Sequence, residues 1–426
     1  LNPETRRSGG MHYTSIENIH KVIDPLFLND LKEELEAIKA EPIEKKRIQK
    51  AREYQDKLAS LKFLDPACGS GNFLTETYLS LRQLENEAMS IIGDLFNPIK
   101  VDIHQFYGIE INDFAVATAT TALWIAEAQM MAKTERMLHI NLDFLPLKSY
   151  NNIKEGNALR MDWNEVVPAS ELNYIMGNPP FIGYSLQSKE QKTDILSIYI
   201  DEKGRPYSTA GKIDYVAGWY WKASEMMAST GKVIRTALVS TNSITQGEQV
   251  AAIWKPLFDR FGIHIDFAWR TFRWDSEANE KAHVHCVIIG ISIYGGNDNF
   301  LYDNGKRLNV SHISPYLIDC CDVFISGRSK PICDVPIMQN GGKPTEGGFL
   351  IMSVEEKDET FKNGPSAEKG IRPYMMGKDF IDRKCRYCLW LTKATPSDIR
   401  RSPYILDRVN KVKLYRLASP KSATRE

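Results

Sequence analysis

Short apolar segments rich in β-branched and aromatic residues alternate with longer helical segments through the middle of the chain. This alternation is typical of a doubly wound α/β domain with a mostly parallel sheet. The last two strands have no helix between them, so we expect one antiparallel hairpin there. The expected strands are residues 61–65, 106–111, 152–159 (with its exit loop), 173–177, 232–240, 264–272 and 283–292, and the expected helices are residues 73–92, 114–133, 215–229 and 249–261.

The pattern differs on either side of this middle region. Residues 29–60 are dense in Glu, Lys, Gln and Leu and predict two charged helices, the second over 44–60. Their apolar stripe is thin, which favours a solvated connector over a coiled coil or a partner-binding surface. After about Pro315 the alternation stops, and Gly and Pro become frequent. We therefore divide the chain into residues 1–60, 61–315 and 316–426.

The charge of the chain is balanced overall but not locally. Its 426 residues carry 54 Lys and Arg and 54 Asp and Glu, yet residues 326–426 hold 20 of the basic and only 12 of the acidic residues. A basic, Gly- and Pro-rich C-terminal region on a neutral protein suggests an anionic partner. A solvated charged surface is the alternative.

Cysteine usage and hydropathy restrict the cell compartment in which the protein is expected. Seven scattered cysteines, an odd number, argue against a disulfide framework and favour the cytoplasm. Cys385 and Cys388 form a single CxxC, and without a second pair we expect no metal site. No window is long and apolar enough for a bilayer, so we expect no membrane association. The sequence does not begin with Met, and we expect a fragment of a longer protein.

The strongest local signal is FLDPACGSGNFL at residues 63–74, where a strand ends at Asp65 and a glycine loop leads into a helix. Gly69 and Gly71 allow a sharp turn and a close approach of backbone to a ligand. A dinucleotide fingerprint requires a third glycine near position 74, which is Leu. A carboxylate at the strand tip also suits an ammonium group better than a pyrophosphate, and S-adenosylmethionine carries such a group.

Two further strand ends support a nucleoside ligand. Glu110, in GIEIN at the tip of the next strand, has the position from which an acidic side chain accepts hydrogen bonds from ribose hydroxyls. NAD and S-adenosylmethionine folds share that geometry. Asn157, in EGNAL after the third strand, lies where an adenine edge is expected, although a plain turn residue is the alternative.

The sequence GNPPF at residues 177–181 distinguishes among nucleoside-binding enzymes. An exocyclic amine of a base is a poor nucleophile because its lone pair is delocalised into the ring. The Asn178 side-chain oxygen and the Pro179 carbonyl can accept its two N–H bonds, and Pro179 and Pro180 hold both acceptors in place. Phe181 offers a flat face on which a base can stack. A simple Asn-Pro turn after a strand is the alternative.

These motifs, in this order, resemble those of the amino-group DNA methyltransferases, most of all the N6-adenine enzymes. The chain is most similar to the MmeI-like type II restriction–modification proteins, in which the methyltransferase lies between an upstream nuclease and a downstream target-recognition domain. Residues 10–14, GMHYT, resemble the family's N-terminal cofactor arm. Residues 327–350 and 372–391 resemble the segment that leads into the recognition domain.

The resemblance implies a class I S-adenosylmethionine-dependent methyltransferase fold and a site-specific methyltransferase that acts on a flipped adenine in double-stranded DNA. It makes residues 1–60 the cofactor arm and connector, 61–315 the catalytic domain, and 316–426 the linker and a partial recognition region. The catalytic residues would be Asn178, Pro179, Pro180 and Phe181, and Phe272 or Trp274 would stack on the other face of the base. The cofactor-binding residues would be Tyr13, Thr14, Asp65, Pro66, Ala67, Gly69, Gly71, Asn72, Phe73, Glu110, Ile111, Asn157, Ala158 and Asn178.

Several alternatives remain at this point. The amine could belong to cytosine, although N4-cytosine enzymes prefer Ser at the position of Asn178, or to an RNA adenine or a protein glutamine. A cofactor-binding but inactive or truncated DNA-recognition subunit is a different class of protein. The upstream nuclease of the family is absent from this sequence, and Glu355, Glu356 and Lys357 are interpreted as a solvated charge cluster. We therefore expect no DNA cleavage by this chain.

Overall fold

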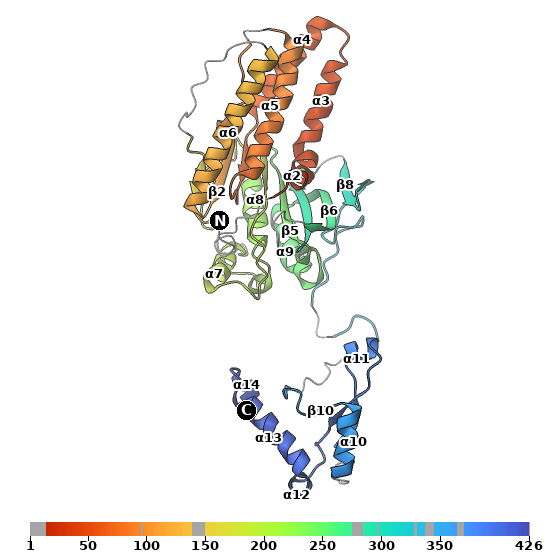
Figure 1. Ribbon diagram of the computed structural model, residues 1–426. Helices are drawn as coiled ribbons and strands as arrows, with labels where there is room; N and C mark the ends of the chain where they lie inside the picture. The colour runs from red at the N-terminus through yellow and green to blue at the C-terminus, as the bar shows by residue number, and fades with distance from the viewer. Residues whose placement is uncertain are drawn as a thin grey trace. The chain divides into compact units, whose positions relative to one another are not determined.

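The computed structural model describes residues 14–94, 97–138, 150–274, 284–295, 298–327, 330–336, 345–363 and 370–425. The chain divides into two compact units, Leu1–Arg328 and Ser329–Glu426 (Figure 1). Tyr13, one of the expected cofactor residues, lies outside the described residues, and so does the side chain of Trp274.

The first unit is built on a sheet in which nine strands lie within the described residues, in the order β3-β2-β1-β4-β5-β7-β6-β8-β9. The strands are β1 (Phe63–Asp65), β2 (Phe106–Glu110), β3 (Ile153–Glu155), β4 (Tyr174–Gly177), β5 (Arg235–Thr241), β6 (His264–Trp274), β7 (Val284–Ser292), β8 (Asn299–Asp303) and β9 (Lys306–Val310). The pairs among β1 to β5 are parallel, as the alternation of strands and helices predicted.

The expected antiparallel pairing of the last two predicted strands is confirmed, since β6 and β7 run antiparallel. Strand β7 also pairs antiparallel with β5, so it lies between β5 and β6, although it follows both in the chain. The doubly wound sheet with this pair has the class I methyltransferase architecture that the resemblance implied. Strands β8 and β9 were not predicted, because β8 is short and mostly half-buried and β9 is exposed except at its last residue.

Helices cover both faces of this sheet, because successive strand residues point to opposite faces. Phe63 packs into the cluster on one face and its neighbour Leu64 into the cluster on the other. The first face carries α2 (Ile16–Ile23), the π-helical turn η1 (Asp24–Leu28), α3 (Asn29–Lys39), α4 (Glu44–Ser60), α5 (Asn72–Ile92) and α6 (Asp113–Leu138); the second carries α7 (Lys189–Ile198), α8 (Ala217–Ala228) and α9 (Gly247–Phe261). The short 3-10 turns are η2 (Ile103–Gln105), η3 (Trp163–Glu165), η4 (Ala210–Lys212) and η5 (Asn242–Thr245).

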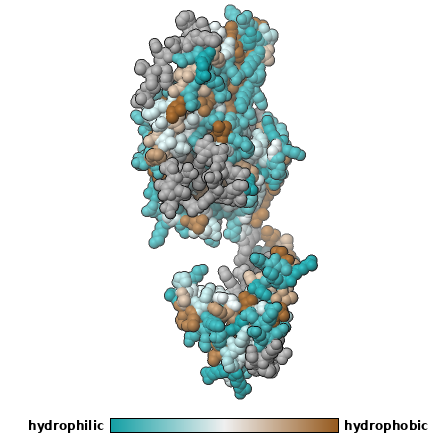
Figure 2. All heavy atoms as spheres, in the orientation of Figure 1, coloured by the Kyte–Doolittle hydropathy of each residue, from teal (hydrophilic) through white to brown (hydrophobic). Residues whose placement is uncertain are grey.

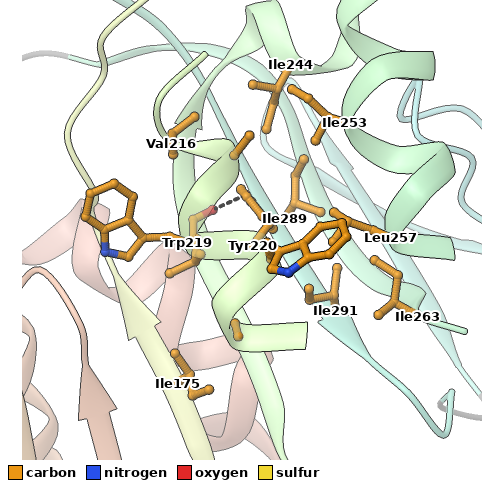
Figure 3. Packing of buried hydrophobic residues seen from close by; sticks show 14 of the residues in the cluster. Ile175, Val216, Trp219, Tyr220, Ile244, Ile253, Leu257, Ile263, Ile289 and Ile291 are labelled. Carbon is orange, nitrogen blue, oxygen red and sulfur yellow. Dashed lines mark hydrogen bonds between the residues drawn. The ribbon is translucent and has the colours of Figure 1, made fainter. Parts of the chain in front are cut away.

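The core of the second face is aromatic. Helix α8 supplies Trp219 and Tyr220, which Figure 3 shows on two sides of the helix, with Ile253 and Ile289 beyond Tyr220. The Tyr220 hydroxyl donates to the Leu238 carbonyl oxygen at 3.2 Å, which ties α8 to β5. Tyr220 therefore holds α8 against the second face of the sheet.

Helices α3 and α4 have the predicted positions, but they are not a solvated connector. Leu31, Leu35, Tyr54 and Leu58 are almost fully buried in the core of the first face. The Tyr54 hydroxyl also donates to the Leu31 carbonyl oxygen at 2.9 Å. The thin apolar stripe is sufficient here because α3 and α4 pack against α5 and against each other. The two helices therefore belong to the first unit.

The second unit has a small antiparallel sheet of its own, and the strand order within its described residues is β10-β12-β11. Met352, Ile371, Leu389 and Ile405 form its core. Its elements are β10 (Ile351–Met352), α10 (Val354–Asn363), β11 (Ile371–Tyr374), α11 (Gly377–Ile381), β12 (Arg386–Leu389), α12 (Pro396–Arg401), α13 (Pro403–Leu417) and α14 (Ser422–Arg425).

The visible surface is largely hydrophilic, and the cysteines are unpaired. Figure 2 shows hydrophilic residues over much of the visible face of each unit. All seven cysteines are free thiols, as their scattered positions predicted. Within the described part of the chain, no helix is both long and apolar enough to cross a membrane. The described His, Cys, Asp and Glu residues form no group of three that could hold a metal ion.

Candidate functional site

The polar residues singled out in the sequence lie at one edge of the first unit's sheet. Strands β1, β2, β3 and β4 are parallel, with Asp65 in register with Gly108 and Glu110 with Glu155. Because parallel strands end at a common edge, the tips of β1, β2 and β4 lie side by side. Asp65, Glu110 and Asn178 are thereby brought to one place.

The glycine loop between β1 and α5 is a tight turn held against β2. Gly69 and Gly71 have φ angles of +53° and +82°, in the left-handed region that disfavours other residues. A Cβ atom on Gly71 would lie 2.9 Å from the Ala119 Cβ of α6, so this position also needs the space. The Cys68 amide donates to the Ile109 carbonyl oxygen at 3.1 Å. The loop is therefore a rigid backbone surface that leads directly into α5 at Asn72.

Asp65 is a buried carboxyl group at the tip of β1, and only 1% of its surface is exposed. Burial raises the pKa of Asp65 to about 8, and the charge of Glu110 adds to this rise. The amide of Ala67, which donates to Oδ1 at 3.0 Å, lowers the pKa and offsets part of the rise. A Cβ atom on Gly177 would overlap the Asp65 carboxyl group. The glycine before Asn178 therefore lets β4 approach this carboxyl group closely.

Glu110 accepts two backbone hydrogen bonds at the tip of β2. Its Oε2 accepts from the Gly69 amide at 2.9 Å and its Oε1 from the Asn112 amide at 3.0 Å. Each carboxylate oxygen has more than one lone pair, so acceptor capacity for a ligand hydroxyl remains. Glu110 thus holds the glycine loop by a hydrogen bond and also lies beside the position expected for the nucleoside. The adjacent Ile111 is 66% exposed and presents an apolar surface at the same strand end.

The Asn178 side-chain oxygen is buried and has no hydrogen-bond partner. Buried acceptors are normally satisfied, so an unpaired one in a native structure requires an explanation, and a site for a ligand N–H group is one. Pro179, next to it, is buried, whereas Pro180 is exposed and Phe181 is half-buried against the core of the first face. This corner therefore presents an unused acceptor and an aromatic ring.

Asn157 lies in the loop after β3 with both ends of its amide engaged. Its Oδ1 accepts from the Leu159 amide at 3.0 Å, as in an Asx turn, and its Nδ2 donates to Asp194 Oδ2 at 3.1 Å. The structure thus contains the turn that the sequence left as the alternative. Ala158 is buried, and its carbonyl oxygen accepts from the Trp163 indole at 2.8 Å.

Two buried aspartates that the sequence analysis missed hold the surrounding loops. Asp194 lies on α7, which was not predicted, although Ser188 and Gln191 form a capping box that marks its start. Asp214 Oδ1 accepts from the Tyr184 amide at 3.0 Å and so holds the segment that follows Phe181. Their sequence contexts gave no sign of these roles.

Trp219 is a third residue whose contact with the site was not predicted. Its indole donates to the Pro66 carbonyl oxygen at 3.0 Å, which ties α8 to the glycine loop. The other expected loop residues, Ala67 and Phe73, lie at the loop and at the start of α5, and Phe73 is buried. Pro66 is thus anchored from the opposite face of the sheet.

The residues expected on the other face of a bound base lie near the end of β6. Phe272 lines a pocket of about 620 Å³ together with Ser15, Lys21, Trp269 and other residues. The Lys21 ammonium lies 5.3 Å from the Phe272 ring centre. Neither Asn178 nor Phe181 lines this pocket. Trp274 ends β6, and Thr14, at the start of the described chain, is buried.

Comparisons with known proteins agree along the whole chain. A family model described as the DNA-methyltransferase domain of MmeI matches residues 40–303, and a model of the MmeI target recognition domain matches residues 319–426. DNA methyltransferase A of Bacillus subtilis is 38% identical over 431 residues, which cover 99% of this chain and 47% of that protein. A putative type II restriction enzyme and methyltransferase of Methanocaldococcus jannaschii is 26% identical over 136 residues, 30% of this chain and 11% of that protein.

Among solved structures, the type IIL restriction–modification enzyme MmeI in complex with DNA is 40% identical and superposes with a TM-score of 0.87. The match covers 100% of this chain and 57% of MmeI. The chain therefore spans about half the length of these two relatives.

Proposed function

This chain belongs to the MmeI family of DNA methyltransferases, and from that premise we propose that it transfers a methyl group from S-adenosylmethionine to the N6 amine of an adenine in DNA. The observation that carries this proposal is the buried, unpartnered side-chain oxygen of Asn178 at the tip of β4. An acceptor kept dry and unpaired is costly for the free protein, and a target amine that donates to it would remove that cost.

The chemistry of the amine explains why an acceptor is needed. Hydrogen bonds from the amine to the Asn178 oxygen and the Pro179 carbonyl draw electron density onto nitrogen as it attacks. The nitrogen lone pair forms the new N–C bond, the C–S bond breaks onto sulfur, and a proton then leaves the nitrogen for solvent. Rigid acceptors in a buried site need little reorganisation in the transition state, which is the main source of their effect.

The residues at the strand tips fit S-adenosylmethionine. The glycine loop allows close approach of the backbone, Asp65 offers a buried carboxyl group for the ammonium of the methionine half, and Glu110 and Asn157 lie where the ribose and adenine would be held. When bound, the cofactor supplies a methyl group that is already activated by its sulfonium. Gly177 sets Asp65 beside Asn178, so the methionine end and the acceptor would be neighbours.

The proposed substrate is double-stranded DNA with the target adenine flipped out of the helix. MmeI has been solved in complex with DNA, and residues 319–426 match its target recognition domain. The second unit holds a net excess of basic residues, which suits phosphate contacts. Stacking on Phe181 would offset much of the few kcal/mol needed to flip a base.

The test is the substitution Asn178→Ala, assayed with radiolabelled cofactor on duplex DNA, RNA and a glutamine-containing peptide in parallel. We expect labelling of adenine in duplex DNA by the natural chain and a loss of at least ~100-fold in turnover for the variant. Calorimetry should show that the variant retains its cofactor affinity. Near-normal turnover of the variant, or labelling of RNA, peptide or cytosine instead of adenine, would refute the proposal.

A further inference from the structure

Asp194 accepts three hydrogen bonds at a buried position, two from the loop after β3 and one from the segment before α8. It lies on α7 and is only 4% exposed. Its Oδ2 accepts from Asn157 Nδ2 at 3.1 Å and from the Tyr215 hydroxyl at 3.0 Å, and its Oδ1 accepts from Arg160 Nε at 2.6 Å. A buried carboxylate with several donors, one of them charged, is well satisfied and holds its partners in fixed orientations.

Two contacts determine which way the Asn157 amide faces, one at its NH2 end and one at its oxygen. An ionised carboxylate only accepts hydrogen bonds, so the NH2 end of Asn157 must point at Asp194 and the oxygen must point away from it. That oxygen takes the Leu159 amide at 3.0 Å. A carbonyl oxygen has two lone pairs, so one acceptor position remains. Without Asp194 only the Leu159 amide holds the Asn157 side chain in this orientation.

The orientation has a chemical consequence at the proposed adenine position. A carbonyl oxygen attracts the 6-amino group of adenine, and it repels the 6-oxo group of hypoxanthine, which is itself an acceptor. We propose that Asp194 is a positioning residue that orients Asn157 and thereby makes the cofactor pocket select a 6-aminopurine over a 6-oxopurine. This inference rests on the proposed use of S-adenosylmethionine, and it assigns the selectivity for the cofactor's base to a residue outside the motif block.

Asp194 also supports the glycine loop through Tyr215 and Trp219. A test must separate this structural role from its effect on the orientation of Asn157. Tyr215 packs edge to face against Trp219, with ring centres 5.3 Å apart, and Trp219 donates to Pro66 of the glycine loop. Loss of Asp194 could therefore loosen the pocket as a whole and weaken all ligands equally. The ratio of affinities for two ligands that differ only at position 6 of the purine is insensitive to such general loosening.

The experiment measures binding of S-adenosylhomocysteine and S-inosylhomocysteine by calorimetry to the natural chain and to Asp194→Asn. The natural chain should prefer the adenosine compound by at least ~10-fold, the value of one well-made hydrogen bond against a mismatched one. In Asp194→Asn the preference should fall below ~3-fold. Arg160→Leu is the matched control: it removes the donor to Asp194 Oδ1, leaves the contact of Oδ2 with Asn157, and should keep the preference.

Asn157→Ala provides a second variant if Asp194→Asn does not fold. It leaves Asp194 with its other two donors, and the preference should again fall below ~3-fold. A preference that survives in either folded variant would overturn the inference, and so would its loss in Arg160→Leu. If the natural chain binds neither compound, the proposed cofactor itself is wrong. If it binds both equally, the cofactor proposal stands and only this inference fails.

Discussion

The buried carboxyl group of Asp65 allows a quantitative test, because the same residue should serve the site and destabilise the fold. The perturbation is Asp65→Asn, which keeps the shape of the side chain and removes its titration. Burial raises the pKa of Asp65 from 3.8 to about 8 in the folded chain, whereas the unfolded chain retains the ordinary value. Between these two values the folded state binds one proton more than the unfolded state.

This extra proton determines the direction and the size of the change in stability with pH. Stability falls with rising pH wherever the folded state binds more protons, by about 1.4 kcal/mol per pH unit for one proton. The loss begins near pH 4, ends near pH 8, and amounts in total to on the order of 5 kcal/mol. Asp65→Asn has no such term. Its free energy of unfolding should therefore exceed that of the natural chain by about 3 kcal/mol more at pH 7.5 than at pH 5.5.

Urea unfolding followed by tryptophan fluorescence measures this difference in the first unit, since every tryptophan except Trp390 lies there. Thr121→Ala is the control, because it shortens an exposed side chain that carries no titrating group. Its difference from the natural chain should not change with pH. If the curves of Asp65→Asn and the natural chain are separated equally at pH 5.5 and 7.5, the buried titration does not exist.

The same substitution should weaken cofactor binding while it stabilises the free protein, because a neutral amide attracts the ligand's ammonium group less than a carboxylate does. Calorimetric titration with S-adenosylhomocysteine at pH 8.5 checks this. An unchanged affinity would remove Asp65 from the proposed site, whatever its effect on stability.

Three further outcomes are expected. Gly71→Ala should lower the free energy of unfolding more than Gly69→Ala does. Both substitutions strain a left-handed residue by about 1–2 kcal/mol, but only the Cβ atom at position 71 would meet a neighbour, at 2.9 Å. Equal losses in urea unfolding would contradict this. His20, whose pKa two neighbouring carboxylates raise to about 9, should stabilise the fold fully below pH 6.5 and lose that contribution as pH rises to 9. The difference in unfolding free energy between the natural chain and His20→Gln should thus shrink over that interval by about 1 kcal/mol, allowing for solvent screening, and a constant difference would refute it. Phe181→Ala should lower methylation of paired adenine ~10-fold or more relative to mismatched adenine, measured with labelled cofactor, and equal losses on both would argue against stacking of a flipped base.

The alternation of strands and helices and the motifs at the strand tips were readable from the sequence, because each depends on neighbours in the chain. The short apolar run of a strand such as β1 and the glycines of the following loop are local properties. They sufficed to predict a mostly parallel sheet and a nucleoside site beside Asn178. Strands β8 and β9 were not predicted because β8 is short and mostly half-buried, and β9, at the edge of the sheet, is almost wholly exposed.

Other features depend on residues that are far apart in the chain, and only the folded structure decides them. Leu31 and Leu58 look like members of a thin stripe until α5 and the sheet cover them. Strand β7 lies between β5 and β6 because it pairs with both of them, and these pairings join residues that are far apart in the chain. Asp194 contacts Asn157, from which it is separated by 37 residues in the chain. The Asn178 oxygen is unpaired because the surrounding chain buries it without supplying a donor. Burial and long-range hydrogen bonds are properties of the assembled fold, and no local pattern encodes them.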